Sequence, residues 1–379
     1  MTDWTADQQA LRDGLAPWLE KLSAGHVERD AEAAFSRENW AAVAATGILG
    51  LPFDEQWGGL GQSLLTTMYV LEGLGEGCRD AGLNFSVCTH IVSTGVPLHR
   101  FGSPELKARF LPGICSGELI GAHAISEPDS GSDALAMRTR AVRDGDHFVL
   151  NGSKAFVSNG PVADLLTVYA RTSERPGPLS ITAFLVERDT PGLTVGGPIA
   201  KMGLRTSPLS ELYFDDCRVP ASQVVGRVGG GFLVLDHVMR WEILCSFVIN
   251  AGEMRDRVTR CVEYARNRTQ FGQPIGSYQA VSHKIVDMEV GVETARHWLY
   301  GTAEKMAAGE NVTCDIAMAK LVTSEANVAS ALSAVQIFGG NGYMAEYGIE
   351  KELRNAVAGT IYSGTSEIQR NRIASLLGL

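Results

Sequence analysis

The apolar residues of this chain change their spacing twice along the sequence, and this change restricts the folds that the chain can adopt. Up to about residue 118 they recur at helical spacing, as Leu11, Leu15 and Leu22 do. Between about 119 and 226 they form short alternating runs separated by Asp-Gly, Asn-Gly and Pro-Gly pairs, which is typical of strands and turns. Helical spacing then returns. We expect an α+β fold with a helical domain at 1–118, a β-rich domain at 119–226 and a helical domain at 227–379.

The same patterns place the individual elements of the two later domains. Expected strands lie at 147–150, 164–170, 180–187 and 211–214. Strands at this spacing favour a compact β-barrel or sandwich. Expected helices lie at 232–266, 278–308, 314–338 and 350–358. Four helices with short connections predict a four-helix bundle, in which a ligand site lies between facing helices.

Charge and composition exclude several classes of function. The net charge of the 379 residues is −10 and the basic residues form no cluster, which argues against nucleic acid as the main partner. No run of apolar residues is long enough to span a membrane, and the first residues lack the pattern of a signal peptide, so we expect a cytoplasmic protein. The seven cysteines and eight histidines show no metal-binding spacing. We therefore expect no metal.

Two stretches of the β-rich domain combine hydroxyl groups with glycine. Residues 123–133 include Ser126 and Ser132, and residues 151–160 add Phe156 and Ser158, which lie two positions apart and therefore on one face of a strand. The first stretch alone is equally well explained as a polar strand end before a turn. Together the two stretches favour a wall with a stacking ring and hydrogen-bond donors for a flat ligand.

The end of the chain contains two glycine turns, at 339–342 and at 363–366. The second has the sequence Ser-Gly-Thr-Ser ahead of an amphipathic segment, which is typical of a loop capped into a terminal helix. Small and hydroxyl residues at a helix start suit a polar, planar ligand held against the backbone.

Glu242 lies on a largely apolar stripe of the helix expected at 232–266. A half-buried carboxyl group without a close cation has a raised pKa and is a candidate general base. The alternative is a glutamate that extends its carboxylate toward solvent or forms a salt bridge, for example with Arg240 or Lys284. The stripe follows alternating steps of three and four residues through Phe232, Leu235, Met239, Glu242, Ser246 and Ile249.

Five motifs, taken in order, resemble the acyl-CoA dehydrogenase family of flavoproteins, and the resemblance covers the whole chain. They are Ser-Glu-Pro-x-x-Gly-Ser-Asp at 126–133, Asn-Gly-x-Lys at 151–154, Arg-Thr-Gln-Phe-Gly at 268–272, Gln279, and Gln-Ile-Phe-Gly-Gly-Asn-Gly-Tyr at 336–343. The resemblance implies an N-terminal helical domain, a middle β-barrel and a C-terminal four-helix bundle. It also implies FAD bound between the subunits of a homotetramer or dimer.

The resemblance further implies roles for single residues in binding FAD. Ser126 and Ser158 look like the hydroxyls that face flavin N5 and the ring edge, and Ser132 looks like a phosphate contact. Phe156 stands where the family often has a tryptophan over the flavin. The positions that match contacts to the FAD diphosphate and adenosine, partly across the subunit interface, are Arg268, Phe271, Gln279, Gln336, Gly339 and Gly340.

The family reaction removes a proton from Cα of an acyl thioester while Cβ gives a hydride to flavin N5. Many members place the base as a glutamate where this chain has Ser363, and an alcohol cannot serve as that base. The backbone N–H at 363 still suits the thioester oxygen. Isovaleryl-CoA dehydrogenases instead place the glutamate on a bundle helix, and the corresponding residue here is Glu242. Thr365 and Glu367 match contacts near the cofactor.

The substrate side departs from the common pattern. Medium- and short-chain members have aspartate and arginine where this chain has Arg240 and Ile243. The surrounding motifs look most like the subgroup that oxidises acyl or aminoacyl groups tethered to carrier proteins, such as the L-prolyl carrier-protein dehydrogenases. Arg240 suits a phosphopantetheine phosphate, and Ser363 and Gly364 match the thioester end. An acidic carrier prefers a basic landing surface, which the overall acidity of the chain does not favour.

These observations predict an FAD-dependent α,β-dehydrogenase of an acyl or aminoacyl thioester on a carrier protein or CoA, which passes electrons to an acceptor such as an electron-transfer flavoprotein. A short- or branched-chain acyl-CoA dehydrogenase of catabolism is one alternative. A flavin oxidase or monooxygenase on the same fold is another. A third is a non-catalytic paralogue that lost its base at position 363.

Overall fold

The N-terminal domain is helical, and several of its helices begin at hydroxyl caps. The computed structural model describes residues 3–175 and 177–379. Thr5, Ser36, Ser63 and Ser103 each accept a backbone N–H at a helix start. The helices are α1 (Ala6–Asp13), α2 (Ala16–Ser23), α3 (His26–Glu32), α4 (Arg37–Ala45), α5 (Leu64–Gly77), α6 (Ala81–Cys88), α7 (Val96–Phe101) and α8 (Pro104–Ser116), and a π-helix, Thr89–Gly95, joins α6 to α7.

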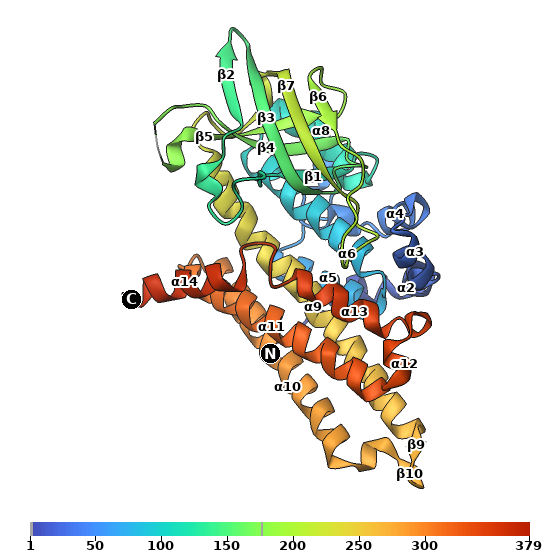
Figure 1. The fold of residues 1–379 in the computed structure, drawn as a ribbon. Coiled ribbons are helices and arrows are strands. Elements are labelled where there is room, and N and C mark those ends of the chain that lie inside the picture. The colour runs from blue at the N-terminus through green and yellow to red at the C-terminus, as the bar shows by residue number, and fades with distance from the viewer. Residues whose placement is uncertain (1–2, 176) are drawn as a thin grey trace.

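The middle domain is a mixed eight-stranded sheet, which lies at the upper end of the molecule in Figure 1. Its strands follow the order β6-β7-β3-β2-β4-β5-β8, and β1 pairs in parallel with β4. β4 and β5 are buried on both faces: Val168 packs in the core of the sheet, whereas Tyr169 packs in the core shared with the helices. The strands are β1 (Gly121–Ala124), β2 (Arg140–Asp144), β3 (His147–Ser158), β4 (Leu165–Arg171), β5 (Ile181–Glu187), β6 (Leu193–Val195), β7 (Leu209–Pro220) and β8 (Val224–Val225).

The C-terminal domain is the expected bundle, and Figure 1 shows its helices running diagonally away from the sheet. The helices predicted at 232–266, 278–308, 314–338 and 350–358 correspond to α9 (Gly231–Asn267), α10 (Gln279–Ala307), α11 (Thr313–Phe338) and α13 (Ile349–Ala358). The predicted α+β fold class is confirmed. The remaining elements are the hairpin β9 (Thr269–Gln270) and β10 (Gln273–Pro274), α12 (Gly340–Tyr343) and the terminal helix α14 (Ser366–Leu376).

Two glycines allow α5 of the first domain to cross α9 of the third at close range. A Cβ on Gly75 would lie 2.2 Å from the carbonyl oxygen of Ile249, and a Cβ on Gly252 would lie 2.2 Å from that of Glu72. Any other residue at these positions would push the helices apart. The contact fixes α9, which carries Glu242, against the N-terminal domain.

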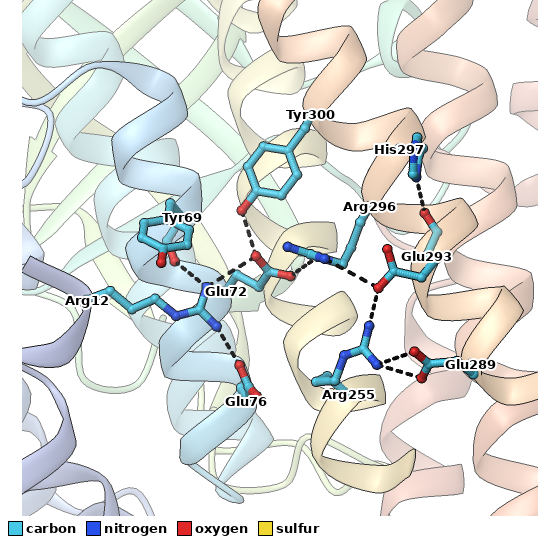
Figure 2. Close-up of polar contacts among 10 residues, drawn as sticks. All are labelled: Arg12, Tyr69, Glu72, Glu76, Arg255, Glu289, Glu293, Arg296, His297 and Tyr300. Atoms are coloured by element: carbon cyan, nitrogen blue, oxygen red, sulfur yellow. Dashed lines mark hydrogen bonds and ion pairs between the residues drawn. The ribbon is translucent and has the colours of Figure 1, made fainter. Parts of the chain in front are cut away.

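A buried carboxylate strengthens this contact (Figure 2). Glu72 on α5 accepts hydrogen bonds from Arg12 at 3.3 Å, from Arg296 at 2.6 Å and from the Tyr300 hydroxyl at 2.7 Å. The three donors come from α1 and α10, so one side chain joins the first domain to the bundle. Among the residues that the structure describes, no helix is long and apolar enough to cross a membrane.

Candidate active site

Glu242 lies in α9 with its carboxylate between two hydroxyl groups. The Oγ of Ser363 donates to Oε1 at 2.5 Å, and the Oγ of Ser93 donates to Oε2 at 3.2 Å. The Glu242 side chain is 15% exposed. The carboxylate is therefore held by the π-helix of the first domain and by the loop before α14. Ser93 is 149 residues from Glu242 in the sequence, and Ser363 is 121 residues from it.

Ser93 was missed by the sequence patterns because it lies in the π-helix Thr89–Gly95, whose wider turn breaks helical periodicity. Two contacts anchor this turn to β1. The Thr94 hydroxyl donates to the carbonyl of Ala122 at 3.0 Å, and His90 Nδ1 accepts the N–H of Gly121 at 3.0 Å. π-helical turns often occur at functional sites, and a run of β-branched and small residues was the signal available in the sequence.

The electrostatic setting of Glu242 suits a general base. Burial raises the pKa of Glu242, and the hydrogen bonds from Ser363 and Ser93 oppose that shift. His123 Nδ1 lies 3.9 Å from Oε2, but burial lowers the pKa of His123 to about 4, so its ring is neutral near pH 7. Arg240 pairs instead with Asp236 at 2.7 Å. Among the described residues, neither Arg240 nor Lys284 forms the salt bridge considered as the alternative for Glu242.

The loop that carries Ser363 has a strained backbone. Ser363 has φ of 55° and Gly364 has φ of 87°, both in the left-handed region. Gln369 holds the turn, because its Nε2 donates to the carbonyls of Ser363 and Gly364 at 3.0 and 3.2 Å. Within the described chain, the amide N–H of Ser363 has no acceptor. Thr365 caps α14, as expected, by accepting the N–H of Ile368 at 3.3 Å, and Glu367 lies in the first turn.

The two polar stretches of the β-rich domain lie side by side. The N–H of Ala155 donates to the carbonyl of Ser126 at 2.9 Å, and buried Lys154 donates to Glu127 at 2.8 Å. Glu127 also accepts the N–H groups of Arg138 and Thr139. Glu127 and Lys154 therefore build the wall, a role that the sequence patterns did not assign to them. The contacts of Ser126 and Ser158 with a cofactor stay a prediction.

Phe156 projects from this wall. It has φ of 56°, and 67% of its surface is exposed, which is unusual for a phenylalanine. β3 has a register shift between Lys154 and Val157, and this irregularity reorients Phe156. Ser132, the predicted phosphate contact, lies exposed in the adjoining loop.

The predicted diphosphate and adenosine contacts gather at the opposite end of the molecule, around the β9–β10 hairpin (Figure 1). Phe271 has φ of 52° and is 94% exposed. Tyr264 near the end of α9 stacks on Phe338 with ring centroids 4.1 Å apart, and Asn341 donates to the Tyr264 hydroxyl at 3.2 Å. These contacts join α9 to the glycine turn at 339–342. This end carries Arg268, Phe271, Gln279, Gln336, Gly339 and Gly340, all exposed.

Family models match nearly the whole chain in three parts. The N-terminal, middle and C-terminal domains of acyl-CoA dehydrogenase match residues 5–118, 122–217 and 229–378. The chain belongs to the acyl-CoA dehydrogenase family. This membership confirms the predicted family, and with it the expected FAD-dependent oxidoreductase that acts on an acyl thioester.

Several relatives within the family are similar to this chain over most of its length. An L-prolyl-[peptidyl-carrier protein] dehydrogenase of Serratia sp. is 41% identical over 344 residues, which cover 91% of this chain and 89% of the relative. An L-prolyl-[peptidyl-carrier protein] dehydrogenase of Pseudomonas fluorescens is 40% identical, with 91% of each chain covered. An isovaleryl-CoA dehydrogenase of Pongo abelii is 34% identical, covering 96% of this chain and 87% of the relative.

Two solved structures are similar to this chain over its whole length. The prolyl acyl carrier protein oxidase AnaB is 39% identical with a TM-score of 0.96, and all of both chains is covered. PigA with FAD and proline is 38% identical with a TM-score of 0.97, covering 100% of this chain and 99% of that one.

Proposed function

We propose that this chain dehydrogenates an aminoacyl thioester, with Glu242 as the base that removes the proton from Cα. The observation that carries the proposal is the half-buried carboxylate of Glu242, which has two hydroxyl donors and no cation partner among the described residues. Its raised pKa brings the carboxyl group closer to the working range of a general base at neutral pH.

Ser363 has two roles in this proposal. Its hydroxyl orients the Glu242 carboxylate, as the 2.5 Å hydrogen bond supports. Its amide N–H, which has no acceptor among the described residues, binds the thioester oxygen and stabilises the negative charge that develops there when Cα loses its proton. The left-handed turn at Ser363 and Gly364 fixes the direction of that N–H.

The residues of the chain fit FAD, which supplies a hydride acceptor when bound. Phe156 presents an exposed aromatic face beside the wall built by Glu127 and Lys154. The Oγ of Ser366 and the Oε1 of Gln369 are buried next to Thr365 without a hydrogen-bond partner in the described chain, as expected beside a polar ligand. We assign the isoalloxazine ring to the space between the wall at Phe156 and the start of α14.

We assign the diphosphate and adenosine to the hairpin end of a second copy. Within one chain, the sheet-domain residues and the hairpin residues lie at opposite ends (Figure 1). Phe271, exposed at 94%, is a ring that a partner surface or ligand would cover. The functional unit is then at least a homodimer, with each FAD held by both copies.

We take the substrate to be an L-prolyl or similar small aminoacyl group on a carrier protein, as the names of the relatives from Serratia and Pseudomonas support. Next to the base, Cys88 Sγ lies 3.1 Å from the Ser246 hydroxyl, and the Tyr362 ring packs against Phe85 and Phe247. Phe85, Cys88, Ser246 and Tyr362 line one small cavity, which favours a short acyl group over a long one.

The test is anaerobic bleaching of the FAD absorbance with a matched panel of thioesters. Prolyl, isovaleryl and butyryl groups would each be offered on a carrier protein and on CoA. The proposal expects the fastest bleaching with the prolyl carrier. Faster bleaching with butyryl- or isovaleryl-CoA would favour a catabolic acyl-CoA dehydrogenase.

An oxidase is the second candidate, because the similar structure of AnaB is that of a prolyl acyl carrier protein oxidase. The two candidates differ in the reaction of the reduced enzyme with oxygen. Rapid reoxidation by O₂ in stopped flow supports the oxidase, whereas slow reoxidation and fast reaction with an electron-transfer flavoprotein support the dehydrogenase.

A further inference from the structure

A basic, partly apolar surface lies at the start of α9, the helix that carries the base. We call it the arginine patch. Arg100 and Arg227 are exposed, and Arg240 is half-buried on the same side of the fold. Large apolar side chains accompany them with unusual exposure: Leu179, Val228, Phe232 and Leu233 are 73%, 51%, 36% and 57% exposed.

The parts of the arginine patch are held together by backbone and ring contacts. The N–H of Gly226 donates to the carbonyl of Phe101 at 3.0 Å, which places Arg227 next to Arg100. Phe101 packs edge-on against His237 at 5.4 Å between ring centroids. Burial, with the nearby Arg100 and Arg240 cations, lowers the pKa of His237 to about 4, so both arginines lie near its ring. The patch is therefore one continuous surface rather than scattered arginines.

The local charge of the patch is opposite to that of the whole chain. Asp236 pairs with Arg240 at 2.7 Å. The described residues provide no carboxylate within salt-bridge distance of Arg100 or Arg227, and neutral His237 adds no charge. Two unpaired cations thus remain on a protein with a net charge of −10. Such a local excess attracts an acidic partner and steers its approach.

The patch also lies at a suitable distance from the base. Phe232 precedes Glu242 by ten residues on one helix, which corresponds to about 15 Å along the axis. An acyl group on an extended phosphopantetheine arm covers a span of this order while its carrier stays on the surface. CoA carries the same arm but has no protein surface to place against Leu179, Val228 and Leu233.

We propose that the arginine patch is the docking surface for an acidic carrier protein that delivers the thioester along α9 to Glu242. Arg100 and Arg227 meet acidic side chains of the carrier, and the exposed apolar residues between them become covered. The proposal rests on the proposed function, and it names the protein surface that separates a carrier-bound substrate from CoA.

The experiment compares one acyl group on two tethers. The double variant Arg100→Glu/Arg227→Glu would be assayed for FAD bleaching with the prolyl carrier protein and with prolyl-pantetheine, which lacks the protein. The patch predicts a fall in kcat/KM of about tenfold or more for the carrier substrate only, because charge reversal acts on association. Added salt should reduce the wild-type rate with the carrier and leave the pantetheine rate unchanged.

Arg143→Glu is the matched control, because Arg143 is an exposed arginine on β2, outside the patch. It should leave both rates at the wild-type value. Equal losses with both tethers in the double variant, or no loss with either, would overturn the docking proposal. A changed oligomeric state in gel filtration would instead assign the patch to contact between copies. Failure of the wild type with both prolyl substrates would reject the proposed function.

Discussion

The corner around Glu242 and the proposed cofactor surfaces differ in how complete they are within one chain. Glu242, Ser363 and Ser93 come from three distant segments, yet direct hydrogen bonds of 2.5 and 3.2 Å join them. Phe156 and Phe271 are instead exposed at 67% and 94%. Phe156 belongs to β3 and Phe271 to the β9–β10 hairpin, and these two elements lie at opposite ends of the molecule (Figure 1). In the proposed mechanism, folding of one chain therefore assembles the acid–base site, whereas the proposed cofactor site needs a second copy. Changes in the first region should alter rates, and changes in the second should alter FAD content.

Replacing the base should produce the largest effect. We expect Glu242→Gln to keep FAD and the oligomer but to lower kcat by about 10³-fold or more, because the amide cannot accept the Cα proton. Steady-state turnover with prolyl carrier protein measures the loss, and FAD absorbance with gel filtration provides the control. Loss of FAD in this variant would break the separation between the two regions.

Removing the buried ion pair between Lys154 and Glu127 should have the second-largest effect. Lys154→Met leaves Glu127 buried without its cation, which should cost about 3–5 kcal/mol of unfolding free energy. Urea unfolding of the FAD-bound protein measures this cost. The matched surface pair Arg109–Glu187, 58% and 38% exposed, should change stability by under about 1 kcal/mol in Arg109→Ala. Equal costs for the two variants would contradict a structural role for Lys154.

Phe271→Ala addresses the cofactor region directly. We expect roughly tenfold weaker FAD binding, because the lost ring contributes about 1–2 kcal/mol of contact with the cofactor or the second copy. Titration of the apoprotein with FAD measures the affinity, and thermal unfolding of the apoprotein checks that the fold is intact. Tyr213→Ala, an exposed aromatic on β7, is the control. Unchanged affinity in Phe271→Ala would remove the hairpin from the cofactor site.

Removing one hydroxyl donor should have the smallest effect. In Ser93→Ala the charged form of Glu242 loses a hydrogen bond, so its pKa should rise and the acidic limb of the kcat/KM profile should move to higher pH. Activity then falls by about threefold to tenfold below the limb and little above it. Ser363→Ala should shift the limb in the same direction, because it removes the other hydroxyl donor to Glu242. The amide N–H of residue 363 remains in this variant and can still bind the thioester oxygen. A uniform loss across the pH range would mean that these hydroxyls do not act through Glu242.

The sequence predicted elements with regular periodicity well, and irregular ones poorly. The expected helix at 232–266 matches α9 closely, because apolar residues recur at helical spacing in its first half and no proline interrupts the segment. The expected strand at 147–150 continues to Ser158 as β3. The sequence pattern missed this extension because register shifts at Leu150/Gly152 and Lys154/Val157 interrupt the alternation of side chains. Local irregularity hides such extensions from a pattern of fixed period.

The candidate site shows the same division. Glu242 was found because it corresponds to the glutamate that the family resemblance places on a bundle helix, and its position on an apolar stripe supported that choice. Ser93 was not, because a serine in a π-helix has no periodic signature. The basic surface at Arg100 and Arg227 was also missed, since these residues are 127 positions apart and the net charge of −10 masks their proximity. Only the fold shows which distant charges meet.

The central claim is that Glu242 removes the substrate proton, and a single turnover tests it most directly because later steps do not contribute. Wild type and Glu242→Gln, both loaded with FAD, would be mixed with prolyl carrier protein in an anaerobic stopped-flow instrument. We predict rapid bleaching of the FAD band in the wild type and bleaching slowed by about 10³-fold or more in the variant. Bleaching of Glu242→Gln at a rate near that of the wild type would contradict the assignment.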